Sequence, residues 1–300
     1  MSVRQRKFAV RAVWLQRLLL LVVLVHVITG LFVDLPYPSW FGLIPAGGFV
    51  ALHIVLGQAA RRDRAGTEPP APLETAPPVT GRWSAVNSPA DKVPSHGTHS
   101  LGQTYAIDIV AEPQEEAEAE EGAEEGAEEG AGAGTRPAFA WLWPVARGNR
   151  DFPAFGAPLL AVADGTVVHA EDGQRDHLSR NSLLAYVYLF LVEGIGRTLG
   201  GARRIVGNHI VLDLGEGTYA LYAHVRRGSL VVRAGDEVTV GQRLGSCGNS
   251  GNSTEPHVHF QLMDGPDLDT ARGVPFRWRG VGVPVGGEVF TVGEQAAPVP

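Results

Sequence analysis

The chain has 300 residues, with 25 Lys and Arg against 32 Asp and Glu, and a formal net charge of -7. Ten of the glutamates lie in one run from Glu112 to Glu129, so the rest of the chain is slightly basic and lacks the strong positive field of a nucleic-acid-binding protein. The one cysteine, Cys247, excludes an intrachain disulfide and a cysteine-based zinc site, so a metal would have to be held by histidines and carboxylates.

The N-terminal part is strongly apolar. Residues 18–33 and 35–60 contain no charged side chain, and the first stretch approaches the length needed to cross a bilayer if it begins near Ala12. We expect two transmembrane helices within residues 1–64, joined near Asp34; a cleavable signal peptide is the alternative for the first. Basic residues flank both stretches and favour a cytoplasmic location for both ends. The sequence therefore predicts a multi-pass membrane protein that contacts lipid through this segment.

Composition divides the remainder. Residues 65–81 are rich in proline and predict an extended linker, and residues 82–292 have the mixed pattern of a folded domain. A Glu/Ala/Gly run at 112–137 has no apolar face for packing and predicts a disordered acidic loop within that domain. Residues 293–300 are expected to form a tail.

The folded part is predicted to be all-β. Short apolar runs at 105–110, 158–170, 208–225, 230–248 and 257–264 are separated by glycine-containing turns, and we expect hairpins around Asp164-Gly165 and around Gly215 to Gly217. The stretch 182–199 favours a helix or a long apolar insertion. This spacing is typical of an antiparallel β-sandwich or open barrel.

Histidines gather near the predicted strands. In the stretch "TEPHVHF" (254–260), His257 and His259 are two residues apart, so a strand would place both on one face and Val258 and Phe260 on the other. Such a pair is often only strand surface. Asp108 in "YAIDIV", His96 and His99 upstream of it, and His224 in "LYAHV" supply further ligand types. Two histidines and one carboxylate can hold zinc and leave a fourth position for water.

Together these motifs resemble a known family. The segment 222–262, with "YAHV", "GDEVTVGQ", "GNSG" and "PHVHF" in that order, is similar to the lysostaphin-type, LytM-like zinc metalloendopeptidases, and "APLLAVADGTVVHA" resembles the strand–turn–strand unit of that family. The resemblance extends over roughly 82–290, with gaps, and does not reach the membrane segment.

The resemblance implies one zinc ion and five site residues. The metal ligands would be Asp108, His259 and either His96 or His99, of which we prefer His96 for its Ser-His-Gly context. The family spacing between the first two ligands is shorter than the spacing here. His257 would accept the proton of the attacking water, and His224 would donate a hydrogen bond to the oxyanion. Three further histidines match no motif and are expected to be polar surface or turn residues: His169, His177 and His209.

The implied activity is zinc-dependent hydrolysis of peptide bonds in peptidoglycan cross-links or stem peptides. The alternative is a non-catalytic module of the same family that regulates another cell-wall hydrolase. A lipoyl- or biotinyl-type carrier is excluded, because the only lysines are Lys7 and Lys92. The side of the membrane stays open, since a wall hydrolase acts outside the cell whereas the basic flanks favour the cytoplasm.

Overall fold

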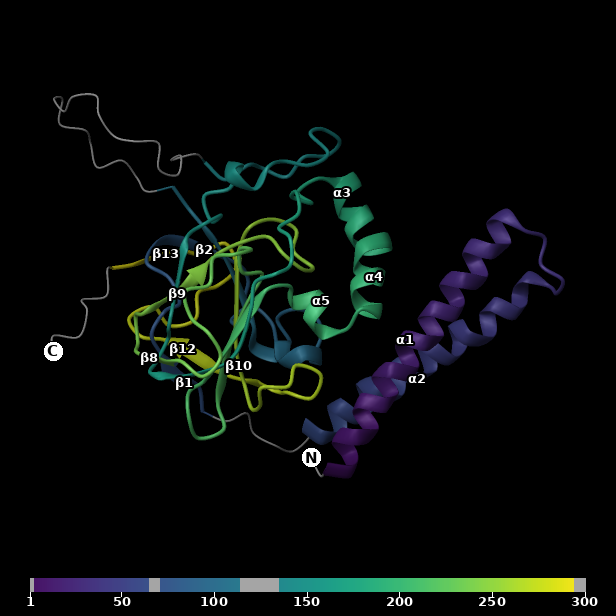
Figure 1. Cartoon of the computed structure of the whole chain (residues 1–300), viewed down its shortest axis with the longest axis horizontal. Coiled ribbons are helices and arrows are strands. Elements are labelled where there is room, and N and C mark those ends of the chain that lie inside the picture. Colours follow the sequence, from purple (N-terminus) through teal and green to yellow (C-terminus); the bar gives the residue numbers. More distant parts are fainter. Residues whose placement is uncertain (1–2, 65–70, 114–134, 294–300) are drawn as a thin grey trace. The chain divides into compact units, whose positions relative to one another are not determined.

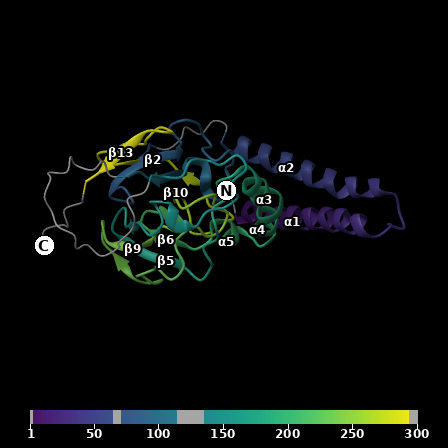
Figure 2. The same cartoon turned by 90° about the horizontal axis from the view of Figure 1, so that it is seen from above.

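The structure is a computed structural model that describes residues 3–64, 71–113 and 135–293. It divides into two units, Met1–Pro69 and Pro70–Pro300. The first unit is a helical hairpin of α1 (Val3–Phe32), a short 3-10 turn η1 (Ser39–Gly42) and α2 (Leu43–Arg64). The second unit is built mainly from β-strands (Figures 1 and 2).

Helices α1 and α2 lie side by side within their hairpin (Figure 1). The segment Ser39–Gln58 is long and apolar enough to cross a membrane, while the apolar stretch Leu18–Phe32 of α1 is shorter. One such helix is weak support for a membrane location, and the predicted pair of crossings is not supported by length and composition.

One antiparallel sheet dominates the second unit, and its neighbours along the sheet run β13-β2-β3-β10-β7-β6-β5-β8, with β11 beside β10. The bounds are β2 (Gly81–Asn87), β3 (Ile107–Ala111), β5 (Gly165–Glu171), β6 (His209–Asp213), β7 (Tyr219–Ala223), β8 (Glu237–Val238), β10 (Val258–Met263), β11 (Gly273–Val274) and β13 (Val289–Val292). Two small sheets pair β4 (Pro158–Leu160) with β9 (Arg243–Ser246) and β1 (Leu73–Thr75) with β12 (Phe276–Trp278). The expected antiparallel β-architecture is therefore found.

The main core lies on one face of this sheet. Every second residue of β10, beginning with Val258 and Phe260, packs into it, as the alternation in "HVHF" predicted. Phe260 makes edge-to-face contacts with Tyr222 (ring centroids 5.4 Å apart) and Phe276 (5.1 Å). On the opposite face, α5 (Ala202–Val206) covers a smaller apolar cluster that includes Leu221. Both faces of β10 are thus buried, which holds this strand rigidly.

Short helices interrupt the strands. They are η2 (Ser100–Tyr105), η3 (Asn149–Asp151), α3 (Leu183–Tyr188), the π-turn η4 (Leu189–Glu193), α4 (Gly194–Leu199) and α5. The expected helical insertion at 182–199 corresponds to α3, η4 and α4, which run in succession along one side of the domain (Figure 1).

The expected hairpin at 158–170 is wrong. Its two strands do not pair with each other, because β4 pairs with β9 while β5 pairs with β6 and β8. The chain passes between two sheets here: the backbone N–H of Ala161 donates to Gln242 O (2.9 Å) and that of Val162 to the Tyr222 hydroxyl (3.0 Å). The hairpin of β6 and β7 is found as predicted, with Asp213 opposite Tyr219.

The predicted linker also differs from the structure. Residues 71–81 are part of the second unit, since β1 pairs in parallel with β12 and the side chain of Val79 is fully buried. Prolines can flank a short strand at the edge of a sheet, because they do not interrupt the hydrogen bonds between central strands. The proline-rich composition of residues 71–81 therefore did not prevent this segment from folding. Of the predicted acidic loop and tail, residues 114–134 and 294–300 lie outside the described residues.

Candidate metal centre

Strand register brings the candidate ligands together. Asp108 on β3 lies directly opposite His259 on β10, and on its other side it is paired with Asn87 on β2. His259 is in turn opposite Ala223 at the end of β7, so that the next residue, His224, reaches the same place. Residues far apart in the chain therefore meet at one point on the sheet.

Three side chains form the candidate metal-binding group. His96 Nε2 is 2.8 Å from Asp108 Oδ2, and His259 Nδ1 is 2.8 Å from Asp108 Oδ1. One potential ligand atom from each residue lies within 4.8 Å of the others. Asp108 and His259 are buried, while His96 is partly exposed, which leaves the site open on one side. Two imidazole nitrogens and one carboxylate oxygen are a donor set typical of hydrolytic zinc sites.

His96 and His99 differ in position. His96 faces Asp108, whereas His99 Nδ1 lies 3.1 Å from the hydroxyl of Thr104 and His99 is not part of the group around Asp108. The residues between His96 and Asp108 include η2, in which Leu101 (φ 58°) and Gly102 (φ 73°) adopt left-handed backbone conformations. A Cβ at Gly102 would lie 2.7 Å from Gln261 Nε2, so only glycine lets the loop pack this closely. The long spacing is accommodated by this folded turn.

The amide of Gln261 fixes the tautomer of His259. Gln261 Nε2 donates to the Leu101 carbonyl (2.7 Å), so its Oε1 is the acceptor for the Nε2–H of His259 (3.0 Å). In the neutral ring Nδ1 then carries no proton and faces the carboxylate of Asp108. Two lone-pair-bearing atoms at 2.8 Å require a shared proton or a cation between them.

Hydrogen bonds also fix the tautomer of His96. The hydroxyl of Ser95 donates to Gln103 O (3.4 Å), leaving its oxygen to accept the Nδ1–H of His96 at 3.0 Å. Nε2 of His96 then also directs a lone pair toward Asp108. The donor chemistry of all three groups therefore fits a bound zinc ion.

His257 and His224 form a second layer beside these ligands. Their rings are 4.8 Å apart, and His257 Nε2 is 3.5 Å from Asp108 Oδ1. The Nδ1–H of His224 donates to Ser250 O, and that of His257 donates to Glu255 O, both at 2.8 Å. Because Nδ1 is the donor in both neutral rings, each presents an unprotonated Nε2 that can accept a proton.

His224 also has an unusual backbone. Its φ of 60° lies in the left-handed region, which costs a non-glycine residue roughly 1–2 kcal/mol. Its amide donates to Val206 O (3.0 Å) and its carbonyl accepts from Gly248 N (3.1 Å), so the surrounding chain holds the conformation. Strain of this kind at a cleft histidine is common in functional sites.

The surroundings shift the pKa values of Asp108, His224 and His257 in different ways. Burial would raise the pKa of Asp108, but the three surrounding imidazoles outweigh it and hold that pKa well below its ordinary value. Burial lowers the pKa of His224 well below its ordinary value, with further lowering by His257 and His259. Burial alone would lower the pKa of His257, but the Asp108 carboxylate raises it. The pKa values of the two neighbouring imidazoles are thus shifted in opposite directions, downward at His224 by burial and upward at His257 by the Asp108 carboxylate.

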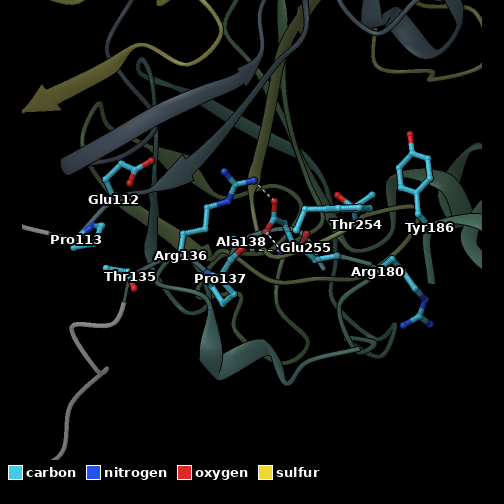
Figure 3. A pocket seen from close by; sticks show the side chains of 12 residues that line it. Glu112, Pro113, Thr135, Arg136, Pro137, Ala138, Arg180, Tyr186, Thr254 and Glu255 are labelled. Atoms are coloured by element: carbon cyan, nitrogen blue, oxygen red, sulfur yellow. Dashed lines mark hydrogen bonds and ion pairs between the residues drawn. The ribbon is translucent and has the colours of Figure 1, made fainter. Parts of the chain in front are cut away.

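The backbone carbonyl that orients His257 is itself held in place. Glu255 is buried, its carboxylate is paired with Arg136, and Asn181 Nδ2 lies 3.4 Å from its other oxygen. Figure 3 shows the paired Arg136 and Glu255 in the lining of a cavity of about 550 Å³, to which Tyr186 and Arg180 also contribute. The lining of this cavity includes Thr254 and Glu255, which come just before His257 in the chain.

A second group of metal-ligand types lies on β5 and β6. His169, Glu171 and His209 come within 4.8 Å of one another, and the two imidazoles stack with centroids 4.5 Å apart. Arg203 already supplies a cation here, since its guanidinium pairs with the Glu171 carboxylate (2.5 Å) and lies 3.3 Å from His169 Nε2. The arrangement fits an ion pair better than a metal site.

Sequence reasoning missed several contributors. Asn87 donates to Asp108 Oδ2 (2.8 Å), Ser253 lies 3.1 Å from His257 Nδ1, and Gln261 orients His259. Of these three, only Gln261 could have been identified from the sequence. It lies two residues after His259, so a strand places its side chain on the same face as those of His257 and His259. Of the three histidines expected on the surface or in turns, His209 is buried on strand β6, so the expectation is wrong for it. His177 is also buried, but it lies in a loop and bonds to the carbonyls of Leu178 and Gly251, as a hydrogen-bonded turn residue would.

Comparisons with known proteins agree with the sequence motifs. Residues 194–270 match the family described as Peptidase family M23. A stretch of 57 residues is 37% identical to the peptidoglycan DD-endopeptidase ShyA of Vibrio cholerae, covering 19% of this chain and 13% of ShyA. Another of 107 residues is 29% identical to an uncharacterized metalloprotease of Haemophilus influenzae, covering 36% of this chain and 16% of that protein. The predicted resemblance to the LytM-like peptidases is thereby confirmed.

Solved structures give matches of the same kind. The catalytic domain of the antimicrobial peptidase lysostaphin from Staphylococcus simulans is 23% identical over 45% of this chain and 84% of that domain, with a TM-score of 0.27. The stretches shared with the curated relatives span 13% to 20% of the length of those proteins.

Proposed function

Since residues 194–270 carry the sequence pattern of peptidase family M23, we propose that this domain is a zinc-dependent endopeptidase that hydrolyses peptide bonds in peptidoglycan. The supporting observation is the meeting of five side chains at one point: His96, Asp108, His224, His257 and His259. The relative named as a peptidoglycan DD-endopeptidase supports the substrate class.

His96, Asp108 and His259 would hold the zinc ion, and their donor atoms and fixed tautomers suit it. A bound zinc ion would supply Lewis acidity, activating water and polarising the scissile carbonyl group. Asn87 and Gln261 would keep the carboxylate and the imidazole in their orientations, as outer hydrogen-bond partners do in metal sites.

The remaining two histidines would move protons. His257, oriented by the Glu255 carbonyl, would take the proton of the attacking water at Nε2. His224, oriented by the Ser250 carbonyl, also presents Nε2 and can donate to the oxyanion only after that atom has gained a proton. The two rings lie close enough to exchange a proton on its way to the leaving amine, through water or substrate.

The test compares metal content with hydrolysis in the purified protein. His259→Ala is expected to lose zinc and hydrolysis of peptidoglycan peptides while the fold is kept, whereas His257→Gln should keep zinc and lose hydrolysis. His169→Ala serves as the control, because its imidazole lies on β5, outside the group around Asp108. A His259→Ala protein that cleaves at the wild-type rate would contradict the proposal. Wild-type protein with zinc but without hydrolysis would favour the regulatory module instead.

A further inference from the structure

Two segments of the second unit expose a concentration of aromatic side chains. Residues 139–145 and residues 183–192 together present six aromatic rings to solvent, here called the aromatic face: Phe139, Trp141, Trp143, Tyr186, Tyr188 and Phe190. Trp141 is 74% exposed and Trp143 82%. Rings of this size are normally buried in a folded domain, so their common exposure needs an explanation.

The two segments form one continuous surface. The Leu183 N–H donates to the Ala140 carbonyl (3.1 Å), and the Ala140 N–H donates to the Asn181 carbonyl (3.1 Å). The Ser182 hydroxyl donates to the Val145 carbonyl (2.6 Å) and also caps α3 by accepting from the Ala185 N–H (3.2 Å). A loop fastened in this way holds its tryptophans beside the helix in a fixed arrangement.

Aliphatic side chains fill the spaces between the rings. Leu142, Leu184, Val187 and Val192 are all exposed, and the sequence "LLAYVYLFLV" of 183–192 has no charged or amide side chain. A sugar-binding surface would combine rings with hydrogen-bonding side chains, whereas this mixture of Leu, Val, Trp and Tyr is typical of a surface that enters the boundary of a bilayer.

Charge favours an anionic lipid surface. Residues 136–150 and 178–199, which contain and flank the aromatic face, carry five arginines and one carboxylate, Glu193. Arg136 is paired with Glu255, and Asp151 follows directly after Arg150, so with these two carboxylates included the net charge is +2. Glu193 is neutralised within the face by Arg180 (2.7 Å) and Arg197 (3.5 Å). Arginines around an apolar face attract anionic headgroups and allow the rings to insert.

The same chain contains a segment that can reach a membrane. Ser39–Gln58 has the length and composition of a membrane-crossing helix, and eight residues separate Arg64, the end of α2, from Leu73, the start of β1. The nine Cα–Cα steps from Arg64 to Leu73 span at most about 32 Å. A bilayer crossed by that helix would therefore lie within reach of the domain.

We propose that the aromatic face docks on the surface of an anionic lipid bilayer, with its tryptophan and tyrosine rings at headgroup depth. Phe139 and Tyr186 belong both to this face and to the lining of the cavity beside Glu255. Figure 3 shows Tyr186 there. Docking would thus hold the candidate metal centre close to the membrane surface. This inference does not depend on the proposed peptidase activity.

The test measures depth rather than binding, because insertion of the apolar segment Ser39–Gln58 would by itself attach the full chain to lipid. Single cysteines are introduced, labelled with an environment-sensitive fluorophore, and the full-length protein is reconstituted into vesicles of phosphatidylcholine and phosphatidylglycerol. Cys247, the only native cysteine, is buried and remains unlabelled. Quenching by phospholipids that carry a nitroxide on the acyl chain reports contact with the bilayer.

Two matched pairs supply the comparison. Leu142→Cys (66% exposed) is compared with Val231→Cys (61%), and Val187→Cys with Val289→Cys (both 45%). We expect quenching several-fold stronger at 142 and 187 than at 231 and 289, and weaker quenching at 142 and 187 when phosphatidylglycerol is omitted. Equal quenching within both pairs would overturn the proposal and identify the aromatic face as a docking surface for another protein.

Discussion

Gln261 Oε1 accepts a hydrogen bond from His259 Nε2 at 3.0 Å, and both residues are buried on the same face of β10. The imidazole is thereby held with Nδ1 unprotonated and directed at Asp108. A glutamine two residues beyond the His-x-His pair thus sets the tautomer of the candidate ligand His259.

Replacing Gln261 by Met should weaken zinc binding. The variant keeps the side-chain volume but leaves the Nε2–H of His259 buried without an acceptor, and loss of such an outer partner typically lowers metal affinity about 10–100-fold. Competition with a coloured chelator measures the change. Gln242→Met is the control, because Gln242 is exposed and accepts from the Thr239 N–H far from the site in sequence. Equal zinc affinity in the two variants would show that Gln261 does not act on the metal.

The first ligand can be decided by a matched pair of substitutions. His96→Ala should lose zinc, because it removes the imidazole 2.8 Å from Asp108 Oδ2. His99→Ala should keep zinc, because His99 Nδ1 lies against Thr104 instead. Zinc stoichiometry of the two purified variants is the measurement, and loss of zinc in His99→Ala alone would reverse the assignment.

His224→Asn should separate chemistry from folding. Asparagine tolerates the left-handed backbone at this position, and its amide can replace the hydrogen bond to Ser250 O. We expect retained zinc, unfolding free energy within about 1 kcal/mol of wild type, and hydrolysis reduced roughly 10²–10⁴-fold.

The control for this variant is His224→Val. A β-branched residue at φ 60° should cost at least about 1–2 kcal/mol more in chemical denaturation. If His224→Asn hydrolyses peptidoglycan peptides as fast as wild type, His224 has no part in proton transfer.

Acid should destabilise the domain through His209. Burial lowers the pKa of its imidazole from 6.5 to about 4. Between these two pH values the unfolded chain binds more protons than the folded one. The stability that comes from keeping His209 neutral is therefore complete above pH 6.5, and it is lost as the pH falls toward 4. Its full size is about 3 kcal/mol, of which about 2 kcal/mol is lost at pH 5.

Urea unfolding of metal-free wild type and of His209→Gln at pH 5 and pH 7.5 tests this point. The variant should show a smaller drop in unfolding free energy between the two pH values, by about 2 kcal/mol. Identical drops would mean that His209 takes up no proton on unfolding. The other histidines are present in both proteins. Their contributions cancel when the drop in unfolding free energy of the variant is subtracted from that of the wild type.

Local patterns predicted the strands near the candidate site well. The alternation in "HVHF" predicted which side chains of β10 enter the core, and the turn at Gly215 to Gly217 predicted the pairing of β6 with β7. Both depend on residues close together in the chain, where periodicity and turn chemistry determine the outcome.

Long-range pairing could not be predicted in the same way. The opposition of Asp108 and His259 joins strands that are 151 residues apart, and only the family resemblance suggested it. The pairing of β4 with β9 instead of β5, and of β1 with β12, depends on which sheet edges are available after folding. Asn87 is a polar strand residue like many others until its register with Asp108 is known.

The burial of Cys247 has a consequence for where the domain can work. The thiol lies in the core, where burial raises its pKa, so that almost no thiolate forms at neutral pH. Oxidants and thiol reagents act on the thiolate, and they would find none within reach. The single thiol of the chain is therefore expected to stay reduced and unmodified both in a reducing cytosol and in an oxidising extracellular compartment.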